Sequence, residues 1–168
     1  GVVAGKTRKD YFYAGSLLYA LEDFKGAVDN YSLMTDRTDS LGQIANYQMG
    51  YSYIRTKNKV AAMQAFKDAS AGSYDKAIQE DAYFNYAKLA FDLNNDPSVF
   101  DSYISTYPSK AKGDKIYSYI ALAALYNHDY AGAVEAYDKI DVLDEDMKNN
   151  YIKANYLRAD QLIEAGSY

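Results

Sequence analysis

The sequence has no cysteine and only two prolines, Pro97 and Pro108, among its 168 residues. Without cysteine the chain forms no disulfide bridges and no thiolate metal sites. This absence is compatible with a reducing or an oxidising compartment. Alternation of apolar and polar residues, the pattern typical of strands, is also scarce. These absences favour a chain built from helices.

Basic residues are outnumbered, and long apolar runs are missing. Eighteen lysines and arginines stand against 23 aspartates and glutamates, which gives a net charge of −5 and a pI near 4.8. Nucleic acid binding needs a concentrated basic face, so we expect no nucleic-acid partner. The uncharged runs, such as Ile116 to His128, are too short to span a bilayer, so we expect no direct membrane insertion.

Residue patterns for catalysis or for cofactor binding are also scarce. The single histidine, His128, lies at a predicted turn, and the motif around it places no partner for general-base or metal chemistry. The acidic cluster at 141–146 lacks the spacing and the central glycine of a calcium loop. No glycine-rich loop of the phosphate-binding kind is present. We therefore expect no active site, no cofactor and no metal.

Apolar residues recur at three- and four-residue steps, as in Ala14, Leu17, Leu18 and Leu21. This period predicts nine helices joined by short connections, which makes consecutive helices antiparallel neighbours. The expected ranges are 8–21, 24–35, 42–56, 59–70, 76–93, 97–106, 114–127, 130–140 and 147–165.

Local residues mark several of the expected helix ends. Ser40, with Gln43 three residues later, predicts a capping box at the start of the third helix. Asp96-Pro97 predicts an acidic N-cap before a proline at the first helical position. Left-handed C-terminal caps are expected at three places: Gly72, Asn94-Asn95 and Gly166.

One motif occurs four times, and its opening returns at the end of the sequence. The segment 22–28 (EDFKGAV) is matched by 128–134 (HDYAGAV), and degraded copies occupy 57–66 and 94–103. A last copy begins at 166–168. The small residues that anchor the copies recur at steps of 35, 37 and 34 residues: Ala27, Ala62, Val99 and Ala133. A period in this range is typical of stacked helical hairpins.

The pattern resembles the tetratricopeptide repeat, a helix-turn-helix unit of about 34 residues. The first unit matches the family at Gly15, Asp23-Phe24, Ala27 and Tyr31. The match covers nearly the whole chain, although no unit has the family's tryptophan or its closing proline. The resemblance implies an all-α fold, a right-handed α-α superhelix of about four and a half hairpins. It also implies that the chain is a segment of a larger bacterial repeat protein. The expected repeats form one array at 8–41, 43–76, 80–113 and 114–147, with the first helix of a fifth at 147–165.

The 20 tyrosines are expected mainly to pack within and between the repeats. Small residues let two helix backbones approach closely, and aromatic side chains fill the remaining gaps. This packing role is assigned to seven tyrosines: Tyr11, Tyr31, Tyr83, Tyr103, Tyr117, Tyr130 and Tyr137.

A second set of side chains is implied by the resemblance to face the concave groove of the array. Its members are Phe12, Tyr19, Tyr47, Tyr51, Ile54, Arg55, Phe84, Lys88, Phe91, Leu122, Tyr126 and Tyr156. An aromatic groove with a few cations suits an extended or helical peptide. The alternative is that Phe12, Phe84, Phe91 and the neighbouring Leu125 only complete the inner wall.

These observations predict a non-enzymatic scaffold that binds a protein or peptide. One alternative is a sugar-binding outer-membrane lipoprotein of the nutrient-uptake kind, whose long inserted loops are missing from this sequence. Another is a regulatory array attached to an enzyme domain. The lysine–asparagine clamp of repeats that hold chaperone tails is absent, with Phe12 and Ser16 at the first matching positions. Tyr107-Pro108 resembles repeats of bacterial cell-envelope proteins, which favours the periplasm or envelope over the cytoplasm.

The last predicted helix, 147–165, is expected to have no partner helix on its outer side. Leu157, Leu162 and Ile163 are then candidates for exposure. We expect weak homodimerisation through this helix.

Overall fold

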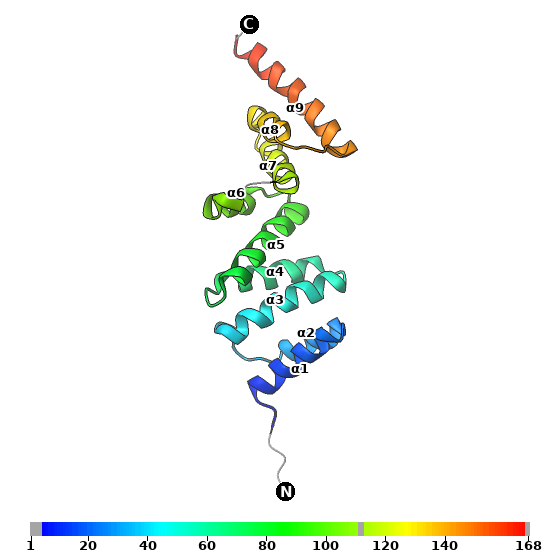
Figure 1. Ribbon diagram of the computed structural model, residues 1–168, viewed down its shortest axis with the longest axis vertical. Coiled ribbons are helices and arrows are strands. Elements are labelled where there is room, and N and C mark those ends of the chain that lie inside the picture. Colours follow the sequence, from blue (N-terminus) through cyan, green and yellow to red (C-terminus); the bar gives the residue numbers. More distant parts are fainter. Residues whose placement is uncertain (1–4, 111–112, 167–168) are drawn as a thin grey trace. The chain divides into compact units, whose positions relative to one another are not determined.

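The computed structural model describes residues 5–110 and 113–166, and the regular elements in these ranges are all helices (Figure 1). The chain divides into two compact units, Gly1–Asn94 and Asn95–Tyr168. The first contains α1 (Arg8–Ala20), α2 (Phe24–Tyr31), α3 (Ser40–Arg55), α4 (Lys59–Ala71) and α5 (Lys76–Asn94). The second contains α6 (Ser98–Thr106), a short 3₁₀ turn η1 (Pro108–Lys110), α7 (Asp114–Tyr126), α8 (Tyr130–Asp138) and α9 (Glu145–Glu164). The all-α prediction is confirmed, and the α-helices of the described residues match the nine predicted ones.

The first unit is built from helical hairpins. Helices α1 and α2 form one hairpin, α3 and α4 form the next, and α5 packs against α4 (Figure 1). Helix α3 also contacts both α1 and α5, so the first helices of the two hairpins are neighbours. Gly15 on α1 is buried against the ring of Tyr31 on α2, where an added Cβ would lie 2.7 Å from the ring. This contact is the predicted pairing of a small residue with an aromatic side chain.

The second unit contains a further hairpin, α7 and α8, against which α6 and α9 pack. Ala121 of α7 and Tyr137 of α8 are buried in one core cluster, and they have the same sequence separation as Gly15 and Tyr31. Asp114, at the start of α7, accepts hydrogen bonds from the backbone N–H groups of Asp141 and Val142 at 2.9 and 3.0 Å. The loop after α8 is thereby fixed to the start of α7.

The turn inside each hairpin places a residue other than glycine in the left-handed region. Glu22, Lys57 and His128 have φ angles of 60°, 62° and 58°. The residue after each of them donates its N–H to a carbonyl five positions back at 2.8 Å, as in the bond from Asp23 to Leu18. This arrangement is a Schellman motif, which satisfies the last carbonyls of the first helix. The repeated sequence motif therefore encodes one repeated turn.

The second helix of each hairpin begins with a side-chain cap. Asp23, Asn58 and Asp129 accept a hydrogen bond from the backbone N–H three residues later, at 2.9 to 3.1 Å. The predicted start of α6 is displaced by one residue. Pro97 holds the N-cap position, while Asp96 accepts from the N–H of Ser98 at 2.9 Å.

The capping box predicted from Ser40 and Gln43 is wrong. Helix α3 is capped by Asp39, whose carboxylate accepts from the N–H of Gly42 at 2.9 Å. Gln43 is buried and points to the end of α4, where its amide donates to the carbonyl of Gly72 at 2.7 Å. Asp39, one residue before Ser40, is the residue that caps the helix. The Gln43 side chain therefore bonds to the loop after α4 instead of to the start of its own helix.

Two of the three predicted left-handed C-terminal caps are confirmed. Asn95 and Gly166 have φ angles of 51° and 73°. Gly72 is extended, with a φ of −77°, so the prediction there is wrong. The amide of Gln43 instead donates to the carbonyl of Ala69 in the last turn of α4 and to the carbonyl of Gly72.

Helix α2 ends four residues before its predicted end. The guanidinium of Arg37 donates to the carbonyls of Tyr31 and Met34 at 3.3 and 3.2 Å. These bonds satisfy the backbone acceptors at the end of α2 from a residue in the following loop. The chain can therefore leave the helix early without burying unsatisfied carbonyls.

Candidate functional site

A cavity of about 310 Å³ lies at the C-terminal ends of α1 and α3. It is lined by Tyr19, Ala20, Glu22, Phe24, Tyr51 and Arg55. Three of these residues, Tyr19, Tyr51 and Arg55, belong to the predicted groove set. The cavity exists because α1 and α3 are neighbours and the turn at Glu22 closes one side of it. We call it the α1–α3 cavity.

One wall of the α1–α3 cavity combines aromatic rings with a guanidinium. Tyr19 meets Phe24 edge to face, with ring centroids 5.7 Å apart. The guanidinium of Arg55 lies 4.6 Å from the centre of the Phe24 ring. Burial raises the pKa of Tyr19, and the positive charge of Arg55 acts in the opposite direction. Tyr19 therefore stays a neutral phenol at physiological pH and can both donate and accept a hydrogen bond.

Within the described residues, Arg55 forms a single ion pair, which joins it to Glu22 at 4.0 Å. Both side chains are largely exposed to solvent, at 58% for Arg55 and 72% for Glu22. An ion pair this long and this exposed contributes little to stability. Replacing Glu22 by the carboxylate of a ligand therefore costs little free energy. A planar guanidinium can bind such a carboxylate through two parallel hydrogen bonds.

Tyr51 and Tyr47 join α3 to α5 through a shared carboxylate. The hydroxyl of Tyr51 donates to Asp81 at 2.6 Å, and the hydroxyl of Tyr47 donates to the same oxygen. The amide of Asn85 donates to that oxygen and to the hydroxyl of Tyr51, both at 3.2 Å. Burial raises the pKa of each phenol, and Asp81 raises it further.

The rings of these two tyrosines also pack on the core. Tyr51 and Phe66 meet at 5.1 Å with nearly perpendicular planes, and Tyr47 lies 6.2 Å from the same ring. Tyr47 and Tyr51 thus pack within the α3–α4 hairpin and bond to α5, and Tyr51 has in addition a surface in the cavity. Their binding role stays a prediction.

The remaining predicted groove residues of the first unit differ in burial. Phe12 and Phe91 are buried, at 8% and 7% exposure, as the inner-wall alternative requires. Phe84 is half-buried, and the ammonium of Lys88 lies 5.2 Å from the centre of its ring. Ile54 is exposed.

Three predicted groove residues lie in the second unit. Leu122 is half-buried on α7, while Tyr126 is half exposed and donates a hydrogen bond to Asn95 at 3.1 Å. Tyr156 on α9 is 71% exposed. These three residues do not line the α1–α3 cavity.

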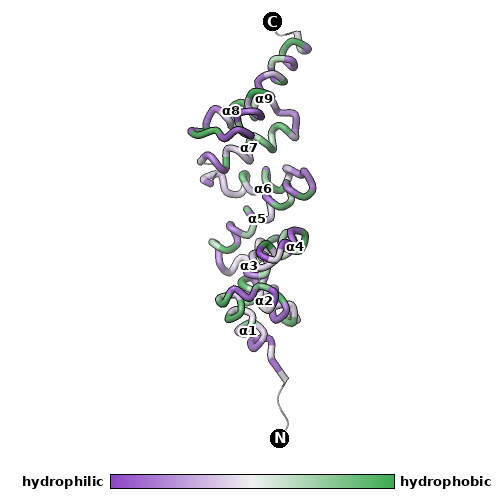
Figure 2. The backbone as a smooth tube through the Cα atoms, turned by 90° about the vertical axis from the view of Figure 1, so that its right-hand side faces the viewer, coloured by the Kyte–Doolittle hydropathy of each residue, from purple (hydrophilic) through white to green (hydrophobic). Residues whose placement is uncertain are grey.

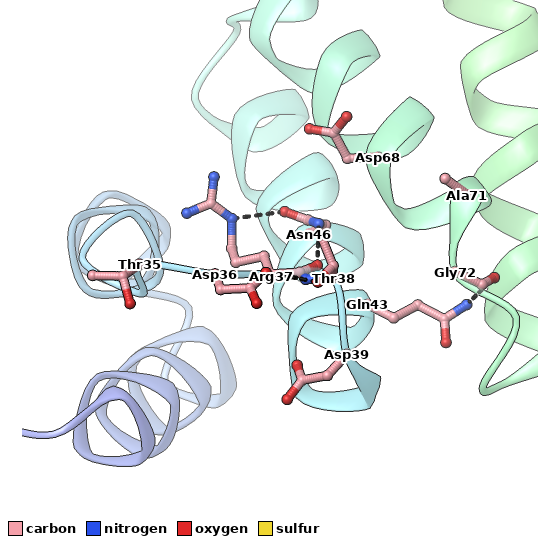
Figure 3. Close-up of a pocket in the computed structure, with 10 residues that line it drawn as sticks. All are labelled: Thr35, Asp36, Arg37, Thr38, Asp39, Gln43, Asn46, Asp68, Ala71 and Gly72. Atoms are coloured by element: carbon pink, nitrogen blue, oxygen red, sulfur yellow. Dashed lines mark hydrogen bonds between the residues drawn. The ribbon is translucent and has the colours of Figure 1, made fainter.

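A second cavity, of about 540 Å³, adjoins the loop between α2 and α3 (Figure 3). It is lined by Thr35, Asp36, Arg37, Thr38, Asp39, Gln43, Asn46, Asp68, Ala71 and Gly72. Figure 3 shows Arg37 and Asn46 pointing toward one another, and the guanidinium donates to the Asn46 carbonyl at 2.9 Å. Gln43 points to Gly72 instead. The polar groups of this cavity join neighbouring hairpins.

Sequence reasoning missed this second cavity. Its lining comes from a loop and from the far end of another helix, which no local motif brings together. The available signal was the presence of two amides, Gln43 and Asn46, on the buried face of α3. Buried amides of this kind need hydrogen-bond partners, so they predict a nearby loop.

Within residues 5–110 and 113–166, no three histidine or acidic side chains are grouped so as to hold a metal ion. Over the same residues, no helix has the length and apolarity required to cross a membrane. His128 is exposed, and its ring stacks on Tyr130 with centroids 5.9 Å apart.

Comparison of the chain with protein-family models, with curated proteins and with solved structures found no match.

Proposed function

We propose that this chain is a tetratricopeptide-like array, a right-handed superhelix of hairpins that binds a protein or peptide without catalysing a reaction. The repeated turn supports the fold, because the left-handed residue and the acidic or amide cap recur in three hairpins at Glu22, Lys57 and His128. The buried pairing of Gly15 with Tyr31 supports it as well. Arrays of this type present extended binding surfaces.

The observation that carries the binding proposal is the composition of the α1–α3 cavity. Aromatic surface from Tyr19, Phe24 and Tyr51 lies beside the guanidinium of Arg55, whose ion pair with Glu22 is long and exposed. The ligand that fits this chemistry is a peptide with an apolar or aromatic side chain next to a carboxylate. Aromatic residues and arginine are the side chains that most often dominate the free energy of such contacts.

The proposal is tested by panning a peptide-display library on the chain and measuring the affinity of the selected peptides by fluorescence anisotropy. We expect enrichment of peptides with an acidic residue beside an apolar one. Arg55→Gln should weaken their binding at least tenfold, since it removes a charge-assisted hydrogen bond of about 1.5–3 kcal/mol. Lys25→Gln is the matched control, because Lys25 is an exposed cation on α2 that does not line the cavity.

A second pair of variants separates the contribution of the aromatic rings to peptide binding from the contribution of the Arg55 charge. Tyr19→Leu removes cavity surface, whereas Tyr13→Leu removes an exposed ring of the same helix that does not line the cavity. Peptides that bind both variants as well as they bind the wild type would place the site elsewhere. Failure to enrich any peptide would contradict the proposed function itself.

A further inference from the structure

Helix α9 has apolar residues on two opposite faces. One face packs against α8, with Tyr151 and Ala154 in core clusters of the second unit. The helices run antiparallel, since Tyr151 bonds to Asp138 at the end of α8 and Gln161 bonds to His128 just before its start. Only Ala154 of this 20-residue helix is fully buried. Most of α9 is thus exposed to solvent.

The second apolar face lies on the other side of α9. Ile152, Tyr156, Ala159 and Ile163 follow steps of four, three and four residues, which places them along one stripe of a helix. Ile152 is 68% exposed, Tyr156 is 71% exposed and Ile163 is 61% exposed. Figure 2 shows hydrophobic and hydrophilic segments alternating along the α9 tube. We call these four residues the α9 stripe.

Leu157 does not belong to this stripe. It is half-buried, and its position three residues after Ala154 places it on the side of α9 that packs against α8. Leu162, at 47% exposure, borders the stripe, and Ile163 lies on it.

We propose that the α9 stripe binds the α9 stripe of a second copy of this chain, with the two helices antiparallel. The order of side chains along the stripe is self-complementary in that direction. When the helices are paired about the midpoint of the stripe, Ile152 faces Ile163 of the second copy, and Tyr156 faces Ala159. A large ring thus meets a small residue at the centre, the combination that lets two helices approach closely.

The charges beside the stripe support the antiparallel direction. Lys153 and Asp160 lie on the same flank of α9, seven residues apart and both exposed. In an antiparallel pair, each flank faces the same flank of the other helix. The two-fold axis therefore brings Lys153 near Asp160 of the second copy, twice per dimer. In a parallel pair about a two-fold axis, Lys153 would face the opposite flank and lose this partner.

The dimer formed in this way is expected to be weak. One four-residue stripe on a single helix provides less contact than the roughly 1,200 Å² of total buried area found in stable complexes. The association should therefore depend on concentration within the range accessible to sedimentation. The two flanking ion pairs add specificity more than affinity.

Sedimentation equilibrium over a concentration series tests the surface. We expect a reversible monomer–dimer equilibrium for the wild type and at least a tenfold weaker one for Ala159→Glu, which places a charge at the centre of the stripe. Ala131→Glu is the matched control, because Ala131 is an exposed alanine on α8. A strictly monomeric wild type, or a dimer that Ala159→Glu leaves unchanged, would overturn the proposal.

A charge swap tests the register. Lys153→Asp and Asp160→Lys should each weaken the dimer, because each places like charges together. The double variant should restore the wild-type affinity, because the pairs re-form with their signs exchanged. A double variant as weak as the single ones would contradict the proposed pairing.

The absence of cysteine from the chain allows a direct test of helix direction. Ile152→Cys and Ile163→Cys chains, one of them isotopically labelled, are mixed and oxidised, and the products are separated by mass spectrometry. The antiparallel pair predicts disulfides between unlike chains, since residue 152 faces residue 163. Disulfides between like chains would show a parallel arrangement and overturn the proposal.

Discussion

Gly50 on α3 lies directly against the ring of Phe66 on α4, where an added Cβ would come within 2.7 Å of the Cδ1 and Cε1 atoms. Phe66 cannot yield easily, because its ring is fully buried and the rings of Tyr47 and Tyr51 pack against it. The hairpin therefore depends on the lack of a side chain at residue 50.

Gly50→Ala should lower the free energy of unfolding by about 1–3 kcal/mol, the range for overpacked sites. An ordinary glycine in a helix interior would behave oppositely, because alanine favours helix by about 1 kcal/mol. Urea denaturation measures the change. Gly5→Ala is the control, since no atom lies within 4 Å of a Cβ added there. A Gly50→Ala variant more stable than the wild type would contradict the close contact.

His128→Gly should raise the free energy of unfolding by up to about 1 kcal/mol. The residue has a φ of 58°, which disfavours a side chain with a Cβ but not glycine. Asn127→Gly is the matched control in the same turn, because Asn127 has a φ of −83° and gains no such relief. Thermal unfolding compares the two variants. A loss of stability in His128→Gly would mean that stacking of the imidazole on Tyr130 outweighs the backbone effect.

Asp81→Ala should lower the free energy of unfolding by about 1–3 kcal/mol. The substitution leaves the hydroxyls of Tyr47 and Tyr51 without their acceptor in a half-buried environment. Asp92→Ala, an exposed carboxylate on the same helix, should change stability by less than about 0.5 kcal/mol. Equal effects of the two variants in urea denaturation would exclude the role of Asp81 in joining α3 to α5.

Stability should fall as the pH rises above 10. Burial raises the pKa of Tyr137 to about 12, and burial also raises the pKa of Tyr31. Between pH 10 and 12 the unfolded chain releases phenolic protons that the folded chain retains, so the equilibrium shifts toward unfolding. Urea denaturation at stepwise pH measures the decline. Tyr137→Phe should make it shallower, and a decline as steep as that of the wild type would show that Tyr137 does not contribute.

The hairpins were predictable from the sequence because their causes are local. The three- and four-residue period gives the helices, and the segments 22–28 and 128–134 carry both the left-handed turn and the cap of the next helix. The pairing of Gly15 with Tyr31 was also accessible, since it recurs at a fixed separation along the chain.

The parts of the structure that sequence reasoning missed depend on distant contacts. The true partner of Gln43 is a loop about thirty residues away, and the early end of α2 depends on Arg37 turning back to it. The predicted groove set mixed buried rings such as Phe12 with exposed ones such as Tyr156, because helical period alone does not say which positions a neighbouring hairpin covers. The α1–α3 cavity likewise depends on two helix ends meeting.

The side chain of Gln43 also holds the backbone N–H of Asp75, which donates to its carbonyl oxygen at 2.9 Å. That amide proton precedes α5 and has its acceptor on α3, so it exchanges with solvent only when the joint between the two helices opens. Its hydrogen-exchange rate is thus a single-residue report of how often α5 separates from the preceding hairpin. Gln43→Glu keeps the oxygen that accepts from Asp75 but loses the amide that donates to Gly72. Comparing the exchange rate of the Asp75 amide in this variant and in the wild type would show how much the donated bond strengthens the joint.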